Sequence, residues 1–154
     1  MTNTSLKKFK IKSDESDLWF WVIVYPNSKQ MREAASNHTA ETGERVSFDG
    51  AAGVCHTYER IRIDPDGKEE VLKQIGTIRL VKDKLHTEVI SHEVVHAAMH
   101  LYRLLHGVEN PLDGSSHNAD FGNGCNQDEE NFAYIYGSLF HSMNMKLHDN
   151  KFWE

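Results

Sequence analysis

The stretch LHTEVISHEVVHAAMHLYRLLH at residues 85–106 decides the fold of this 154-residue chain. Its apolar residues recur every three or four positions over about six turns, which is the pattern of an α-helix that buries one broad face. Gly107 follows at once, and glycine is the residue that most often ends a helix in the left-handed conformation. We therefore expect one long central helix against which the rest of the chain packs.

The segments around this helix predict a small α+β domain. Residues 18–25 (LWFWVIVY) are aromatic and β-branched, which favours a buried strand, and Pro26 ends it. The other expected elements are a helix from Asn27 or Ser28 to Gly43, a β-hairpin of 52–63 with 71–81, and a second long helix over 128–143. We expect one domain over 1–154, with frayed ends at 1–15 and 148–154, in which a short antiparallel or mixed sheet packs on the two long helices.

The central helix carries the motif HExxH, formed by His92, Glu93 and His96. Four residues advance an α-helix by about 40° more than one turn and by about 6 Å, so both imidazoles face one point and can bind one metal ion. Glu93 lies about 100° around the helix from His92, which places its carboxylate beside the metal as a general base. The ordinary alternative is that both histidines are core or surface residues. The ligand types favour Zn²⁺, and they also suit iron(II) or manganese.

A catalytic zinc ion usually has three protein ligands and one open position, so a third ligand is expected. Glu130 is the first candidate, because Ala133 and Gly137 are small residues on its own helical face and would let the two helices approach closely. Glu129 shares its face with bulkier residues and is the second candidate. The ordinary interpretation of either acid is that it complements the dipole of its helix in the first turn.

Three further side chains near the motif are weaker candidates. His117 and Asp120 lie in the long polar loop at 107–127 and could supply the third ligand instead. His100 continues the four-residue spacing after His96, but a ligand there would leave no open position for water, so we expect a core or supporting histidine.

The combination of His92-Glu93-Val94-Val95-His96 with Glu130-Asn131-Phe132-Ala133 resembles the HExxH plus ExxA arrangement of gluzincin metallopeptidases. The resemblance covers the two long helices only, and Tyr134 stands where gluzincins usually have an aspartate. It implies a small zincin-like fold, a Zn²⁺ cofactor held by His92, His96 and Glu130, and a peptide or protein substrate. Together with the Gly-Val-Cys segment at 53–55, these motifs also resemble small uncharacterised HExxH proteins of bacteriophages, which would act in the cytoplasm of the host.

Two functions from different classes follow. The first is a zinc-dependent metallopeptidase or other hydrolase in which metal-activated water reacts with Glu93 as general base, the substrate backbone adding to the edge of the strand at 71–81. The alternative is a binding or regulatory protein, such as a phage factor that engages a host protein, in which the metal only stabilises a zincin scaffold. A third possibility is an apo protein with a decayed site.

Composition narrows the partners and the compartment. The formal net charge of −6 and the pI near 5.9 argue against nucleic acid as a partner, and no apolar run is long enough to span a membrane. The polar start MTNTSLKKFKIKSDES has no signal-peptide pattern, so we expect a cytoplasmic protein. Cys55 and Cys125 fit no disulfide framework and are expected to be free thiols. No feature predicts an oligomeric state.

Overall fold

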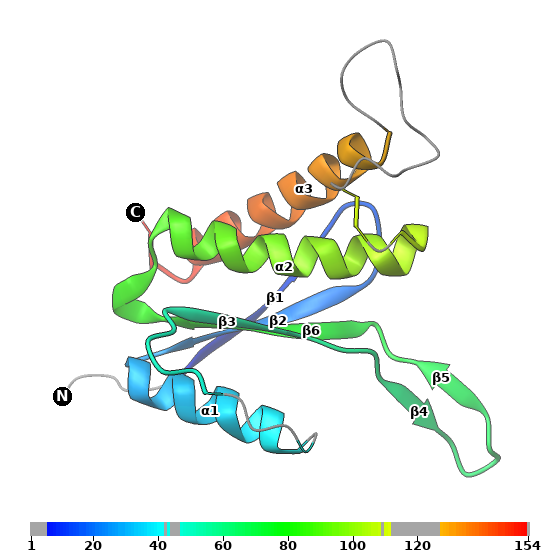
Figure 1. Ribbon diagram of the computed structural model, residues 1–154, viewed down its shortest axis with the longest axis horizontal. Helices are drawn as coiled ribbons and strands as arrows, with labels where there is room; N and C mark the ends of the chain where they lie inside the picture. Colours follow the sequence, from blue (N-terminus) through cyan, green and yellow to red (C-terminus); the bar gives the residue numbers. More distant parts are fainter. Residues whose placement is uncertain (1–5, 42, 44–46, 109, 112–126, 154) are drawn as a thin grey trace.

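A four-stranded sheet with helices on both faces forms the body of the protein (Figure 1). The computed structural model describes residues 6–41, 43, 47–108, 110–111 and 127–153. Its elements are β1 (Lys7–Lys12), β2 (Trp19–Tyr25), α1 (Ser28–Glu41), β3 (Gly53–Thr57), β4 (Ile61–Ile63), β5 (Glu69–Val71), β6 (Gln74–Val81), the 3-10 helix η1 (Lys82–Lys84), α2 (Thr87–His106) and α3 (Gln127–Asp149). Helices α2 and α3 lie on one face of the sheet and α1 lies on the other (Figure 1).

The sheet is mixed, with strand order β1-β2-β6-β3. Strands β2 and β6 are parallel, whereas β1 with β2 and β3 with β6 are antiparallel. The structure therefore confirms the α+β class and the mixed sheet. The predicted helices are confirmed as well. Asn27 caps the start of α1, because its Oδ1 accepts a hydrogen bond from the Gln30 amide at 2.9 Å. Gly107 ends α2 at φ 68°, where its amide donates to the Arg103 carbonyl.

Both expected frayed ends are wrong within the described part of the chain. Residues 7–12 form β1 because lysines alternate with Phe9 and Ile11, whose side chains are buried under α3. At the other end, α3 continues to Asp149, and the indole of Trp153 packs against the core and donates to the Leu85 carbonyl at 3.2 Å. Long apolar side chains near a terminus thus hold it in place despite its polar neighbours.

The predicted β-hairpin is confirmed, but it has two parts. Near the body, β3 pairs with β6, and farther along the same hairpin β4 pairs with β5 as a separate two-stranded ribbon that projects from the sheet (Figure 1). Strand β6 lies between β2 and β3 and is buried along nearly its whole length. The free edge of this hairpin in the described sheet therefore belongs to β3.

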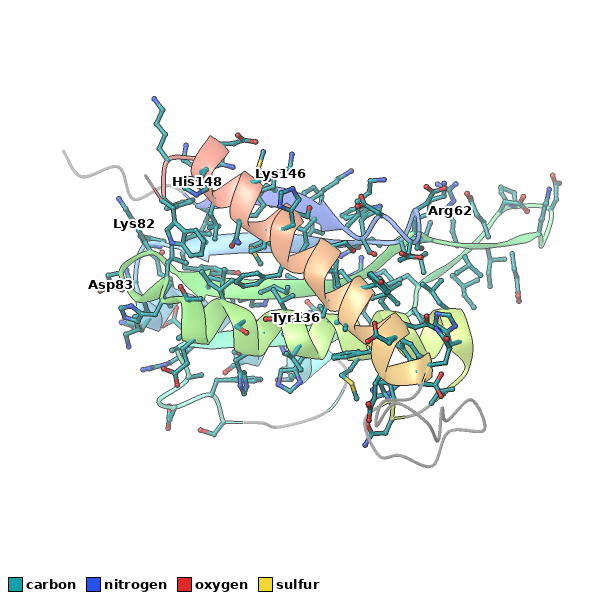
Figure 2. The ribbon with its side chains drawn as sticks, turned by 90° about the horizontal axis from the view of Figure 1, so that it is seen from above. Arg62, Lys82, Asp83, Tyr136, Lys146 and His148 are labelled. Carbon is teal, nitrogen blue, oxygen red and sulfur yellow. The ribbon has the colours of Figure 1, made fainter. Side chains whose placement is uncertain are left out.

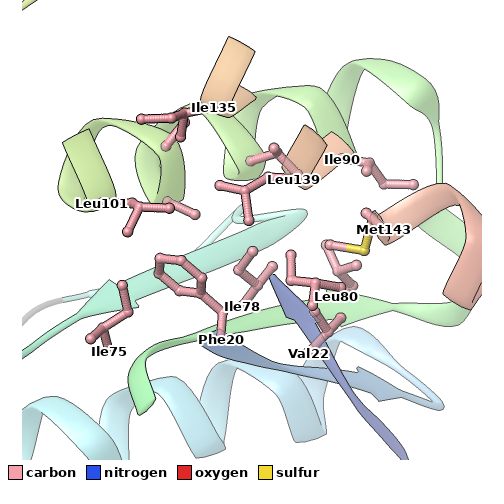
Figure 3. Packing of buried hydrophobic residues seen from close by; sticks show 14 of the residues in the cluster. Phe20, Val22, Ile75, Ile78, Leu80, Ile90, Leu101, Ile135, Leu139 and Met143 are labelled. Atoms are coloured by element: carbon pink, nitrogen blue, oxygen red, sulfur yellow. The ribbon is translucent and has the colours of Figure 1, made fainter. Parts of the chain in front are cut away.

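The main core lies between the sheet and the helices α2 and α3 (Figure 3). Fully buried aliphatic and aromatic side chains from β2, β6, α2 and α3 meet there, including Phe20, Ile78, Leu101, Leu139 and Met143. A smaller cluster beneath α1 contains Met31, Ala35, Val54 and Val81. The main core fixes α2 on the sheet with one side buried and the HExxH side open.

Candidate metal centre

The two histidines of the motif converge on one point at the surface of α2. The Nε2 atoms of His92 and His96 are 3.2 Å apart, and the rings are inclined at 77° with centroids 4.9 Å apart. Two nitrogen atoms that bind one tetrahedral zinc ion at 2.0–2.1 Å are about 3.3 Å apart, so this pair fits two adjacent zinc ligands. Both side chains are exposed, His92 by 68%, which leaves the point between them accessible from solvent.

Glu93 has the opposite environment. Its side chain is only 7% exposed, and its Oε1 is 4.0 Å from His92 Nε2. Burial raises the pKa of the Glu93 carboxyl to about 7, while the charge of His92 acts in the opposite direction. A carboxyl group with this pKa can exchange a proton near neutral pH, as a general base must.

Burial lowers the pKa of His96, and the neighbouring charge of His92 lowers it further. A lower pKa favours the neutral imidazole, which is the form that binds a metal ion. The environment of His96 therefore suits a ligand.

A hollow of about 380 Å³ opens beside the motif, between α2 and the start of β3. It is lined by Ala51, Ala52, Gly53, Glu88, Val89, His92 and Glu93. A Cβ atom at Gly53 would lie 3.0 Å from Glu93 Cγ and 3.2 Å from Val89 Cγ1, closer than an ordinary contact. Glycine at this position thus lets the β3 backbone approach the candidate base.

Helix α3 supports α2 through two hydrogen bonds that the sequence did not reveal. Ser91, next to His92, shares one with Tyr136 at an Oγ–Oη distance of 2.5 Å, near the place where the helices cross (Figure 2). Near the other end of α2, the buried hydroxyl of Tyr102 donates to the carboxylate of Asp128. No spacing rule in the sequence links residues so far apart. The only signal was the run of three acids at 128–130, which predicted the start of this helix.

The structure does not bring the expected third ligand together with the histidines. Within the described ranges, no group of three His, Cys, Asp or Glu side chains could hold a metal ion. Glu130 is exposed and Glu129 is half-buried. The expectation of close helix packing beside Glu130 is wrong, because Gly137 and Ala133 are exposed and a Cβ at Gly137 would meet nothing within 4 Å.

The remaining sequence candidates have the following positions. His100 is half-buried, and its Nε2 lies 3.3 Å from the Tyr58 carbonyl oxygen. Cys55 is a free thiol whose pKa is raised by burial and by the nearby Glu93 carboxylate. His117, Asp120 and Cys125 lie outside the described residues.

Comparison with family models, curated proteins and solved structures finds no match to this chain. The resemblance to gluzincins therefore depends on the two motifs alone. Among the helices that the structure describes, none is long and apolar enough to cross a membrane.

Proposed function

We propose that this protein is a zinc-dependent hydrolase that cleaves peptide or other amide bonds. His92 and His96 would hold the metal ion, and Glu93 would act as general base. The observation that carries the proposal is the 3.2 Å separation of the two Nε2 atoms next to a buried carboxylate whose Oε1 is 4.0 Å from the nearer one. A chance pair of surface histidines has no need for a buried acid beside one of them.

The chemistry follows from these positions. A zinc ion between the two imidazoles would polarise the scissile carbonyl and lower the pKa of water from 15.7 to about 7. Glu93 can accept the proton of the attacking water and then give it to the leaving amine. Glu93 is buried beside the histidines and not at the point where they meet. Its carboxylate would therefore not be a metal ligand and could accept and donate protons.

The third ligand remains a prediction for Glu130 or Glu129, which lie in the first turn of α3. Both are kept because the resemblance to gluzincins implies Glu130 and the half-buried position of Glu129 lies nearer the protein interior. Zinc affinity of the two alanine variants separates them, since loss of a ligand weakens binding and loss of a surface acid does not.

Substrate binding by the strand at 71–81 is not possible along β6, because β6 is paired on both sides. We propose instead that an extended substrate adds to the edge of β3, which has no strand partner on that side in the described sheet. Gly53 on this strand adjoins Glu93, so a backbone paired with β3 would pass the candidate base. The hollow beside Gly53 offers space for a substrate side chain.

The support for the non-catalytic alternative depends on the third ligand. A structural metal ion stabilises a fold chiefly by linking separate elements, whereas His92 and His96 belong to one helix that is already formed. A metal ion bound by these two residues alone would link no separate elements, whereas a third ligand from α3 would join the two helices.

The test combines metal content with turnover. Wild type, His92→Ala, His96→Ala, Glu93→Gln and the control Glu69→Gln, which changes an exposed acid of the projecting β4–β5 ribbon, are purified without chelators. We measure zinc by elemental mass spectrometry and amide hydrolysis by the release of new amino groups from casein and from a mixture of peptides. Wild type is expected to contain about one zinc per chain, which both histidine variants lose.

Glu93→Gln should retain zinc and lose at least about 100-fold in rate, because general base catalysis contributes 10² to 10⁴. Glu69→Gln should retain both zinc and rate. The proposal is wrong if Glu93→Gln hydrolyses as fast as wild type, or if wild type binds no zinc. A large fall in thermal stability on chelation without any turnover would favour the binding protein.

A further inference from the structure

The sheet face opposite α2 and α3 is only partly covered. Helix α1 packs there against β2 and β6 and covers Tyr25, Val54 and Val81. The half of this face formed by β1 and the start of β2 is open (Figure 1). Alternation along the two strands places five residues on it, and we call them the lysine–tryptophan face: Lys8, Lys10, Lys12, Trp19 and Trp21.

The two indoles of this face lie beneath lysine ammonium groups. Lys8 Nζ is 4.0 Å from the centre of the Trp21 ring, and Lys10 Nζ is 4.1 Å from the centre of the Trp19 ring. The indoles are perpendicular, with centroids 4.9 Å apart, and both are half-buried. Cation–π contacts at exposed sites are weak, so the lysines can leave the rings at little cost.

A second contact between an aromatic ring and a cation lies beyond β6, on the same side of the sheet. The Tyr58 ring has the Arg60 guanidinium 4.7 Å from its centre, and its hydroxyl lies 2.7 Å from Thr77 Oγ1. Thr77 is paired in register with Trp21, so Tyr58 belongs to the same side of the sheet. This second aromatic–cation pair lies next to α1, whose His38 ring is 5.5 Å from the Tyr58 ring between centroids.

Charge on this face differs from that of the whole chain. The lysine–tryptophan face carries three positive charges and no acid, whereas the chain has a formal net charge of −6. The nearest acids in sequence are in the turn between β1 and β2, where Asp17 pairs with Lys73 at 3.5 Å. Average charge is therefore a poor guide to what this surface attracts.

We propose that the lysine–tryptophan face binds single-stranded nucleic acid. Bases would stack on Trp19 and Trp21, and Lys8, Lys10 and Lys12 would move from the rings to the phosphates. Such binding requires aromatic rings at the surface interleaved with cations, because every base has a flat face and every nucleotide a negative charge. An acidic peptide would satisfy the lysines but would leave both indoles without a stacking partner. The inference replaces the expectation drawn from net charge, and it is independent of the metal centre on the other face.

The test uses the full chain and a fluorescein-labelled 20-nucleotide oligo(dT), with anisotropy and tryptophan emission recorded together. We expect binding at 50 mM salt with quenching of the emission. Raising the salt to 200 mM should weaken binding about 20-fold if three phosphates are neutralised on a single strand. Trp21→Leu, checked for folding by circular dichroism, should weaken binding about fivefold or more and remove part of the quenching.

Lys7 offers a matched control for Lys8. Both lysines are exposed on β1, but Lys7 lies on the opposite side of the strand. Lys8→Glu should weaken oligo(dT) binding at least about tenfold, while Lys7→Glu, with the same change in net charge, should change it by less than about twofold. The inference is wrong if the two variants behave alike, if no binding occurs at 50 mM salt, or if poly-glutamate or a DNA duplex of equal length binds as tightly as oligo(dT).

Discussion

Replacement of Gly76 by alanine should destabilise the protein more than the loss of any surface contact. Gly76 lies in β6 opposite Phe20 of β2 and Thr57 of β3. A Cβ at this position would be 2.7 Å from the His56 carbonyl oxygen and 2.7 Å from Phe20 Cδ1. The carbonyl belongs to the backbone of β3, and the Phe20 ring is fully buried, so neither can move without disturbing the sheet or the core.

Overpacking of this kind costs about 1–3 kcal/mol, and here two rigid neighbours are affected at once. Alanine also lowers the conformational entropy of the unfolded chain, which stabilises the folded protein by about 0.4–1 kcal/mol. We expect a net loss of about 2 kcal/mol, which lowers the melting temperature of a chain of this size by about 4–8 °C.

The assay is urea unfolding followed by circular dichroism, with Gly137→Ala as the matched control. Gly137 lies on the exposed side of α3, and a Cβ there meets nothing within 4 Å. The same chemical change should therefore stabilise the helix by about 0.5–1 kcal/mol. Opposite signs for the two variants would support the contact geometry around Gly76. A Gly76→Ala protein within about 0.5 kcal/mol of wild type would refute it, given the size of ordinary surface effects.

Two further predictions concern the site and the other face of the sheet. Gly53→Ala should lower the rate of amide hydrolysis by about 10- to 100-fold while zinc content stays at the wild-type level, because the new Cβ displaces Glu93 and not the histidines; an unchanged rate would contradict the placement of the base. Burial, and then the charges of His38 and Arg79, lower the pKa of His56 from 6.5 to about 4. The unfolded chain therefore binds a proton first as the pH falls, and stability should decrease between pH 6.5 and about 4 by about 1–2 kcal/mol, after allowance for the partial exposure of the side chain. Urea unfolding of His56→Phe should lack this part of the decrease; equal pH dependence in both proteins would exclude His56 as its source.

Local patterns predicted the parts of the molecule that depend on local geometry. The long apolar series with Gly107 after it predicted α2, and the HExxH spacing predicted that the two imidazoles converge. Both depend only on the 3.6-residue period of one helix. The strand at 18–25 and the hairpin followed in the same way from composition and a turn.

Features that depend on packing between distant segments were not predictable in this way. The sequence of β1 has the composition of a polar terminus, since four of its six residues are lysines. It belongs to the sheet because the side chains of Phe9 and Ile11 are buried. Likewise, nothing in the sequence indicates that β3, and not β6, lies at the edge. Strand order is decided by the parallel pairing of β2 with β6, which joins segments about 50 residues apart.

The orientation of the first turn of α3 explains why the third ligand was the least predictable part of the site. Three acids occur in succession at 128–130, and the sequence does not say which one faces α2. In the structure it is Asp128, which is 3% exposed and accepts the hydroxyl of Tyr102. Glu130 lies two residues later, about 200° around the helix, and therefore faces solvent. Any rotation that brings Glu130 toward α2 moves Asp128 away from Tyr102, so this turn can present one of these two acids to the central helix, not both.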